Sequence, residues 1–171
     1  IHDTLTGRAH PRKATSALAA ALRAKGVEIT DNAPERGKVV HATGAAGLVA
    51  LSEELGKPVG APIKGQSAIF GYDARNCPQI FVDGLHVIPH ADGTTAIGST
   101  TEREFADPSR CDGGLDDILG RIIRLVPVLR ECPVLERWAG LRPRARSRAP
   151  MLGAYPGRPG HFIANGGFKI G

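Results

Sequence analysis

The chain has 171 residues, of which 42% are hydrophobic and 23% are charged, and its net charge at pH 7 is +5. This length suffices for one domain with a hydrophobic core, and the composition is that of a globular protein. No apolar run approaches the roughly 20 residues that cross a bilayer, so we expect no membrane partner.

The spacing of cysteine and histidine residues argues against a metal site and a disulfide framework. His86 and His90 are four residues apart, but Pro89 opposes the helix that would align them. The three cysteines are far apart and form no Cys-x-x-Cys pair: Cys77, Cys111 and Cys132. We therefore expect no metal ion and a reducing, cytoplasmic compartment.

The first third of the chain predicts two helices and two strands. Residues 11–25 have apolar side chains at helical spacing between a proline and a glycine. A short strand is expected at 27–29. Residues 39–44 predict a buried strand that runs into a glycine turn, and a short helix follows at 47–55.

Residues 61–105 show the alternation typical of β-strands, and the turn at 91–93 predicts a hairpin. The expected strands in this segment are 68–70, 79–82, 86–90 and 95–98. Residues 114–130 predict an amphipathic helix, which Pro127 ends or kinks. Its apolar residues at helical spacing are Leu115, Ile118, Leu119, Ile122, Ile123, Val126 and Leu129, and all of these up to Val126 are expected to be buried.

A last strand is expected at 161–164. Together these elements predict an α+β fold that is α/β-like in part. We expect a mixed, largely antiparallel sheet with flanking helices, and the 114–130 helix against one of its faces.

The segment 138–143, Trp-Ala-Gly-Leu-Arg-Pro, places Arg142 between small or apolar residues and a proline. This setting indicates a guanidinium held on a tight, partly buried loop. A fixed arginine fork suits a carboxylate, which it can bind through two parallel hydrogen bonds. The alternative is a core tryptophan beside a solvated arginine.

Four arginines alternate after this tryptophan: Arg142, Arg144, Arg146 and Arg148. On an extended segment, alternation places all four side chains on one side. No aromatic residues interleave with them and no nucleic-acid motif accompanies them. The stripe therefore favours a small anion or a cofactor phosphate over nucleic acid.

Two strands run into glycine turns, at 42–47 and at 164–167. Such turns let backbone N–H groups approach a phosphate or a ring closely, although each alone is also explained as a plain turn or helix cap.

Taken in order, these pieces resemble the FAD-dependent oxidoreductases of the D-amino acid oxidase family, near its glycine oxidase and sarcosine oxidase branch. The resemblance covers most of the chain, and the whole set of matching segments in this order is far more specific than any single segment. The matching segments are 10–12 with 26–29, 39–45, 62–66, 86–89 with 97–102, 138–143 and 166–171.

The chain also departs from the family pattern. The Gly-x-Gly-x-x-Gly fingerprint, which holds the FAD pyrophosphate at a helix N-terminus, does not occur in these residues. The segment between Ile29 and Val39 is shorter by about a hairpin, and we expect further residues at both ends. The resemblance thus implies one compact fragment, in which 1–60 and 161–171 belong to the FAD-binding domain and 61–160 to the substrate-binding domain.

Carried over residue by residue, the resemblance implies that Arg142 binds the substrate carboxylate and that Lys169 lies near the substrate and the flavin. His86 falls where the family often has an active-site tyrosine, and a plain structural role stays open for it. Lys64 is expected to be a solvated residue at a strand entry, and Gln66 is left open. The implied FAD-binding residues are Thr43, Gly44, Gly166, Gly167, Phe168, Lys169, Ile170 and Gly171.

The implied reaction passes a hydride from the substrate α-carbon to FAD and gives an imine that water hydrolyses. Without the nucleotide-binding motif, we expect this chain alone to be inactive and to bind FAD weakly or not at all. The alternatives are a non-catalytic folded fragment, a subunit completed by another chain, or an anion-binding module on the arginine stripe. An amino acid or amine is the expected partner, and the oligomeric state stays open.

Overall fold

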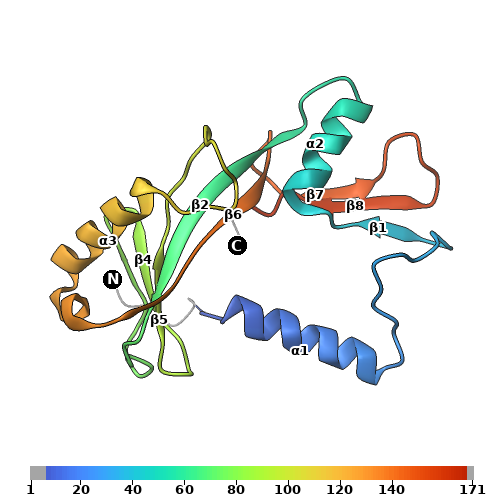
Figure 1. Ribbon diagram of the computed structural model, residues 1–171. Coiled ribbons are helices and arrows are strands. Elements are labelled where there is room, and N and C mark those ends of the chain that lie inside the picture. The colour runs from blue at the N-terminus through green and yellow to red at the C-terminus, as the bar shows by residue number, and fades with distance from the viewer. Residues whose placement is uncertain (1–6, 169–171) are drawn as a thin grey trace.

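The computed structural model describes residues 7–168, which form two sheets and three α-helices (Figure 1). The helices are α1 (Pro11–Ala24), α2 (Gly44–Glu54), α3 (Gly113–Leu125) and the 3-10 helix η1 (Pro127–Glu131). The strands are β1 (Val39–His41), β2 (Gly60–Phe70), β3 (Ile80–Val82), β4 (Leu85–Pro89), β5 (Thr95–Gly98), β6 (Val134–Ala145), β7 (Met151–Ala154) and β8 (His161–Asn165).

The larger sheet has five strands in the order β3-β4-β5-β2-β6, and every neighbouring pair is antiparallel. The smaller sheet has the order β1-β8-β7, in which β1 is parallel to β8. Helix α2 packs against β2, β6 and β8 and so connects the two sheets. The expected mixed, largely antiparallel fold is therefore confirmed.

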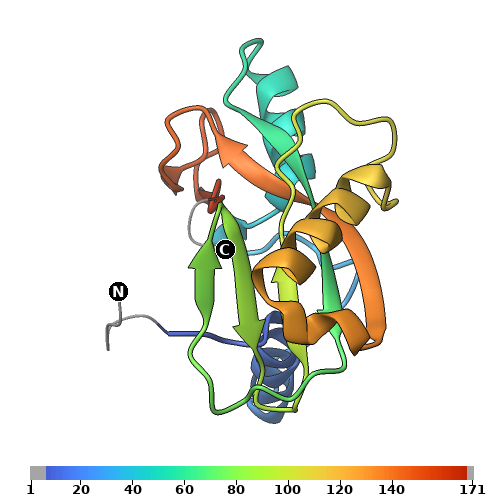
Figure 2. The same cartoon turned by 90° about the vertical axis from the view of Figure 1, so that its left-hand side faces the viewer.

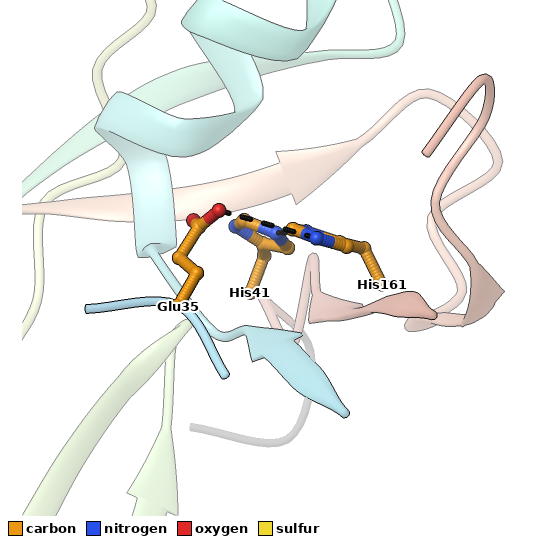
Figure 3. A group of neighbouring side chains, drawn as sticks. All are labelled: Glu35, His41 and His161. Atoms are coloured by element: carbon orange, nitrogen blue, oxygen red, sulfur yellow. Dashed lines mark hydrogen bonds and ion pairs between the residues drawn. The ribbon is translucent and has the colours of Figure 1, made fainter. Parts of the chain in front are cut away.

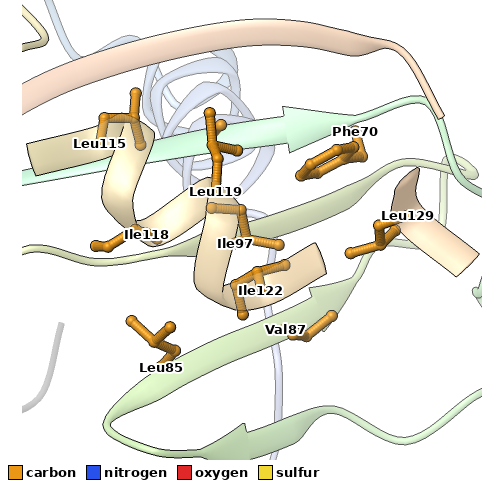
Figure 4. Close-up of a cluster of buried hydrophobic side chains, with 10 residues drawn as sticks. Phe70, Leu85, Val87, Ile97, Leu115, Ile118, Leu119, Ile122 and Leu129 are labelled. Carbon is orange, nitrogen blue, oxygen red and sulfur yellow. The ribbon is translucent and has the colours of Figure 1, made fainter. Parts of the chain in front are cut away.

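The main hydrophobic core lies between α3 and the five-stranded sheet (Figure 4). The side chain of Asp112 caps α3 by accepting a hydrogen bond from the backbone of Gly114. The expected stripe on α3 faces this core, with Ile123 and Val126 half-buried at its margin. Its buried members on α3 are Leu115, Ile118, Leu119 and Ile122, and Leu129 is buried on η1. As expected, α3 ends before Pro127, which begins η1.

Helix α1 lies on the other side of the five-stranded sheet from α3 (Figures 1 and 2). Its first turn is bound by ion pairs, from Arg12 to Glu136 on β6 and from Lys13 to Asp92 in the β4–β5 turn at 2.7 Å. No residue of α1 is buried, and Leu18 on its apolar stripe is 67% exposed. Its helical pattern is thus correct, but no residue of its apolar stripe is buried within residues 7–168.

Three expectations about strands and loops are wrong. Residues 27–29 form no strand, because no strand lies beside them in the described part of the chain, and Val27 and Ile29 are exposed. Strand β1 is an edge strand and Val40 on it is 60% exposed, so it is not buried. Residues 138–143 are not a loop but part of the long strand β6, because β2 offers a continuous partner for them.

The arginine stripe is shorter than alternation predicts, since only Arg142 and Arg144 lie on β6. Arg146 and Arg148 follow the strand in a turn, where Arg148 has a φ of 62°. Strand β7 was not foreseen by sequence reasoning. No helix within residues 7–168 has the length and apolarity needed to cross a membrane.

Candidate functional site

One row of residues crosses all five strands on the sheet face opposite α3. Directly paired residues share a face of a sheet, so the pairing register defines this row. From β6 to β3 it reads Trp138, Ser67, Gly98, His86 and Phe81. Arg142 lies four residues beyond Trp138 on β6, and therefore on the same face. The register thus brings two of the three sequence-predicted substrate residues, His86 and Arg142, to one side of the sheet.

A cavity of about 330 Å³ opens on this face beneath the start of α1. Its lining is largely apolar, with Trp138, Ile69 and Ile88 among its walls, and includes the polar side chains of Ser67, Ser99 and His86. His86 is exposed, and its ring lies 4.5 Å from that of Phe81. An apolar cavity with a few polar groups is typical of a small-molecule site.

Arg142 lies beside this cavity and reaches it through Ser99. Its Nη1 donates to Ser99 Oγ at 3.3 Å, and Nη2 donates to the backbone oxygens of Lys64 and Thr100. Its Nε is buried and has no hydrogen-bond partner within residues 7–168. Burial lowers the pKa of Arg142, and the nearby charge of Glu102 opposes this shift.

The hydrogen bonds of Arg142 limit how it can hold a carboxylate. A guanidinium has five N–H donors, of which three are engaged here, two on Nη2 and one on Nη1. Both forks of a guanidinium include Nη2. A carboxylate bound by two parallel hydrogen bonds would therefore displace one of its two backbone contacts.

The end of the described chain reaches Arg142. The ring of Phe168 lies 5.4 Å from the Arg142 guanidinium carbon and 6.0 Å from that of Arg144. Arg144 also forms an isolated β-bridge with Gly167. Arg142, one of the residues predicted to bind substrate, thus lies near Gly167 and Phe168, two of those predicted to bind flavin.

The two glycine turns also lie side by side, and Asn165 joins them. Its Nδ2 donates to the backbone oxygen of Gly44 at 2.9 Å, and its Oδ1 accepts from the backbone N–H of Gly166 at 2.7 Å. Gly44 and Gly166 have φ values of 61° and 77°, a region that glycine adopts without strain. Thr43 precedes α2, and its hydroxyl packs against Gly47.

Comparison with known proteins identifies the family of this chain. The family model described as DAO, FAD dependent oxidoreductase, matches residues 1–171. The chain belongs to this family. The expected resemblance is therefore confirmed.

Among curated relatives, the glycine oxidase of Pseudomonas putida is 30% identical to this chain over 151 residues. The match covers 87% of the chain and 41% of that protein, so the chain spans about two fifths of its relative. A second glycine oxidase, from Geobacillus kaustophilus, is 30% identical over 89 residues, which are 52% of the chain and 24% of that protein.

The solved structures agree. The crystal structure of the Geobacillus kaustophilus glycine oxidase superposes with a TM-score of 0.67 at 28% identity, covering 77% of the chain and 36% of that protein. An iminodiacetate oxidase from Chelativorans sp. BNC1 has a TM-score of 0.76 at 18% identity, over 91% of the chain and 48% of that protein, and supports the fold alone.

The backbone at the two turns is compatible with the flavin that the family uses. A β-carbon added at Gly44 or Gly167 would meet no atom within 4 Å, so both backbones are open on that side. The rest of the predicted flavin segment, Lys169, Ile170 and Gly171, lies outside the described residues.

The expectation that Lys64 is solvated is wrong, since only 1% of its surface is exposed. Even-numbered residues of β2 face the core, and Lys64 is among them. Its Nζ contacts Asp112 at 2.6 Å and Glu102 at 3.4 Å. Gln66 donates to the same two carboxylates at 2.6 and 2.9 Å. This hydrogen bonding, above all that from Lys64, lowers the pKa of Asp112 to about 2.

The polar network of Lys64, Gln66, Glu102 and Asp112 ties β2 to the start of α3. Thr100 belongs to it as well, because its hydroxyl binds both Glu102 and the backbone N–H of Gln66. The network thereby holds the 99–102 segment, whose Ser99 and Thr100 contact Arg142.

Sequence reasoning missed Gly65, Ser99 and Asn165 as parts of the site. Asn165 carries a visible signal, since it stands between a predicted strand and two glycines. Ser99 and Gly65 lie within the matching segments 97–102 and 62–66. Their roles appear only in the structure, where Ser99 accepts from Arg142 and a β-carbon on Gly65 would lie 2.5 Å from Nη2 of Arg142.

Proposed function

We propose that the complete protein oxidises an α-amino acid or a secondary amine with FAD, and that Arg142 binds the substrate carboxylate. The observation that carries this proposal is the contact between Arg142 and Phe168. It brings the arginine that is the candidate for binding the substrate carboxylate to the predicted flavin-binding turn. The glycine oxidase relatives support the same class of substrate.

In this proposal the cavity beside Arg142 receives the rest of the substrate. Trp138 and Ile88 offer apolar walls, while Ser67 and His86 offer hydrogen bonds. When bound, FAD supplies the acceptor for the hydride that leaves the substrate α-carbon. The protein's own part is to fix the carboxylate and to orient the α-carbon.

We assign residues 1–60 and 161–171 to the FAD-binding domain and 61–160 to the substrate domain, as a working division. Pairing of β1 with β8 supports the first group. Strand β7 lies within 61–160 but pairs with β8, so the border is expected near residue 150.

The test uses the complete protein that contains this chain. It is expected to show a flavin absorbance spectrum and to oxidise members of a panel of glycine, N-methylglycine and larger α-amino acids. A complete protein without a flavin spectrum, or one that oxidises none of these, would overturn the proposal.

The chain of 171 residues alone is expected to bind FAD weakly, because the turns at Gly44 and Gly166 lack the fingerprint that anchors the pyrophosphate. Titration with FAD, followed by flavin fluorescence, measures this. A sub-micromolar dissociation constant would show that the remaining turns suffice.

A further inference from the structure

Two histidines and a glutamate meet at the edge strand of the smaller sheet (Figure 3). Nε2 of His41 lies 3.0 Å from Nδ1 of His161. A carboxylate oxygen of Glu35 lies 3.9 Å from Nε2 of His161. One ligand atom from each of the three residues can be chosen so that all lie within 4.8 Å of one another.

The parallel pairing of β1 with β8 holds the two imidazoles in place. Val39 pairs with His161 and His41 pairs with Ile163, so both histidines project from the same face as diagonal neighbours. Ile163 is buried, and the backbone N–H of Tyr155 donates to the carbonyl of His161 at 2.9 Å. The positions of the two rings are thus set by the sheet and not by a flexible loop.

The other groups around the two rings are already engaged. The carboxylate of Glu54 accepts hydrogen bonds from the Tyr155 hydroxyl at 2.6 Å and from Arg158 at 2.9 Å. Those contacts, with the Tyr155 hydroxyl foremost, lower the pKa of Glu54. The ring of Tyr155 lies 4.7 Å from that of His41 and covers one side of it. Glu35, by contrast, is exposed. Among the described residues, no group other than His161 forms an ion pair or hydrogen bond with its carboxylate.

Two imidazole nitrogens and a carboxylate oxygen are the ligand set that a zinc-class ion prefers. Zinc bonds of about 2.0–2.2 Å place tetrahedral ligand atoms roughly 3.3 Å apart. The two histidine nitrogens already have nearly this separation. The carboxylate of Glu35, on the segment before β1, lies within 4.8 Å of a nitrogen of each ring and would have to move closer to complete the site.

We propose that Glu35, His41 and His161 bind a divalent transition-metal ion of the zinc class, with one coordination position left open. The ion would replace the hydrogen bond between the two rings, and each ring would carry its proton on the nitrogen that faces away from the metal. Metal binding would also tie the segment before β1 to the small sheet, and so stabilise the folded chain.

The test is a calorimetric titration of the chelator-treated chain with zinc chloride at neutral pH. We expect one zinc site per chain. His41→Ala and His161→Ala should each weaken the zinc affinity at least tenfold, and Glu35→Gln should weaken it severalfold. Circular dichroism checks that each variant is folded.

Two matched substitutions serve as controls for the zinc affinity. His86→Ala removes an exposed histidine of the other sheet, and Glu53→Gln removes an exposed carboxylate of α2. Both should leave the affinity unchanged. The proposal is wrong if either control weakens the zinc affinity as much as the His41 and His161 variants do. It is also wrong if the unaltered chain binds no more zinc than the His41→Ala, His161→Ala double variant.

A second measurement needs no variant and so does not depend on its folding. Zinc added to the ¹⁵N-labelled chain should change the ring-nitrogen resonances of two histidines in NMR spectra and leave the others in place. Uniform small changes across all histidine rings would contradict a site made by this pair.

Discussion

The guanidinium of Arg142 occupies the space that a β-carbon on Gly65 would fill. Such a carbon would lie 2.5 Å from Nη2 of Arg142 and 2.9 Å from its Cζ. Gly65 is therefore what allows the arginine to fold back over β2 and reach the carbonyls of Lys64 and Thr100. The position of Arg142, the candidate residue for binding the substrate carboxylate, thus depends on the absence of a side chain at Gly65 on the neighbouring strand.

The first prediction follows from this contact. Gly65→Ala should push the guanidinium away and weaken the apparent substrate affinity of the complete protein about tenfold or more, since a charge-assisted hydrogen bond contributes about 1.5–3 kcal/mol. Gly140 is the matched control, because it pairs with Gly65 and an added β-carbon there would meet no atom within 4 Å. Equal losses in Gly65→Ala and Gly140→Ala would show that the space is unimportant.

The second prediction concerns Arg142 itself. Arg142→Ala in the complete protein should lower the apparent substrate affinity about a hundredfold, which is roughly 2.7 kcal/mol, and leave the flavin spectrum intact. Arg142→Lys should recover little, because an ammonium cannot reproduce the planar fork. Steady-state kinetics over a substrate series measures both effects. If Arg144→Ala proves equally damaging, the two arginines form a shared anion site instead of one carboxylate clamp.

The third prediction tests the buried cation. Lys64→Met should lower the melting temperature of the chain, because it leaves Asp112 and Glu102 without the ammonium that contacts both carboxylates. Lys57→Met changes an exposed lysine and should have almost no effect. Thermal unfolding followed by circular dichroism compares the two. A Lys64→Met variant as stable as Lys57→Met would mean that the network contributes little.

The fourth prediction is a pH dependence of stability. The pKa of Asp112 is lowered to about 2 from an unfolded value near 3.8, chiefly by Lys64. A depressed carboxyl pKa stabilises the folded state above the unfolded pKa, and this contribution is lost as the pH falls through the folded pKa. The stability difference between the unaltered chain and Asp112→Asn should therefore be constant above pH 4 and shrink between about pH 4 and 2. Urea unfolding at several pH values measures it, and a difference that grows towards acid would contradict the assignment.

The fifth prediction concerns the core beneath α3. Ile122 is fully buried, so Ile122→Ala should lower the free energy of unfolding by about 2–5 kcal/mol. Leu18→Ala, on the exposed stripe of α1, should change it by less than about 0.5 kcal/mol. Urea unfolding of both variants checks this contrast. A large loss in Leu18→Ala would show that the stripe of α1 is covered by another surface in solution.

Local patterns in the sequence determined much of the fold. The helical spacing of apolar residues over 114–130 predicts α3, and the turn at 91–93 predicts the β4–β5 hairpin, because both depend on residues close together in the chain. Motif order over the whole chain was sufficient to indicate the family that the comparisons confirm.

The tertiary structure decided whatever depends on distant partners. The segment 138–143 looks like a loop from its glycine and its proline, but β2 supplies a continuous ladder that makes it a strand. Lys64 looks solvated, yet alternation along β2 turns it towards Asp112, 48 residues away. His41 and His161 are 120 residues apart, and only the parallel pairing of β1 with β8 places their rings in contact. Sequence spacing reports neighbours along the chain, whereas strand register, which long-range hydrogen bonds set, chooses the neighbours in space.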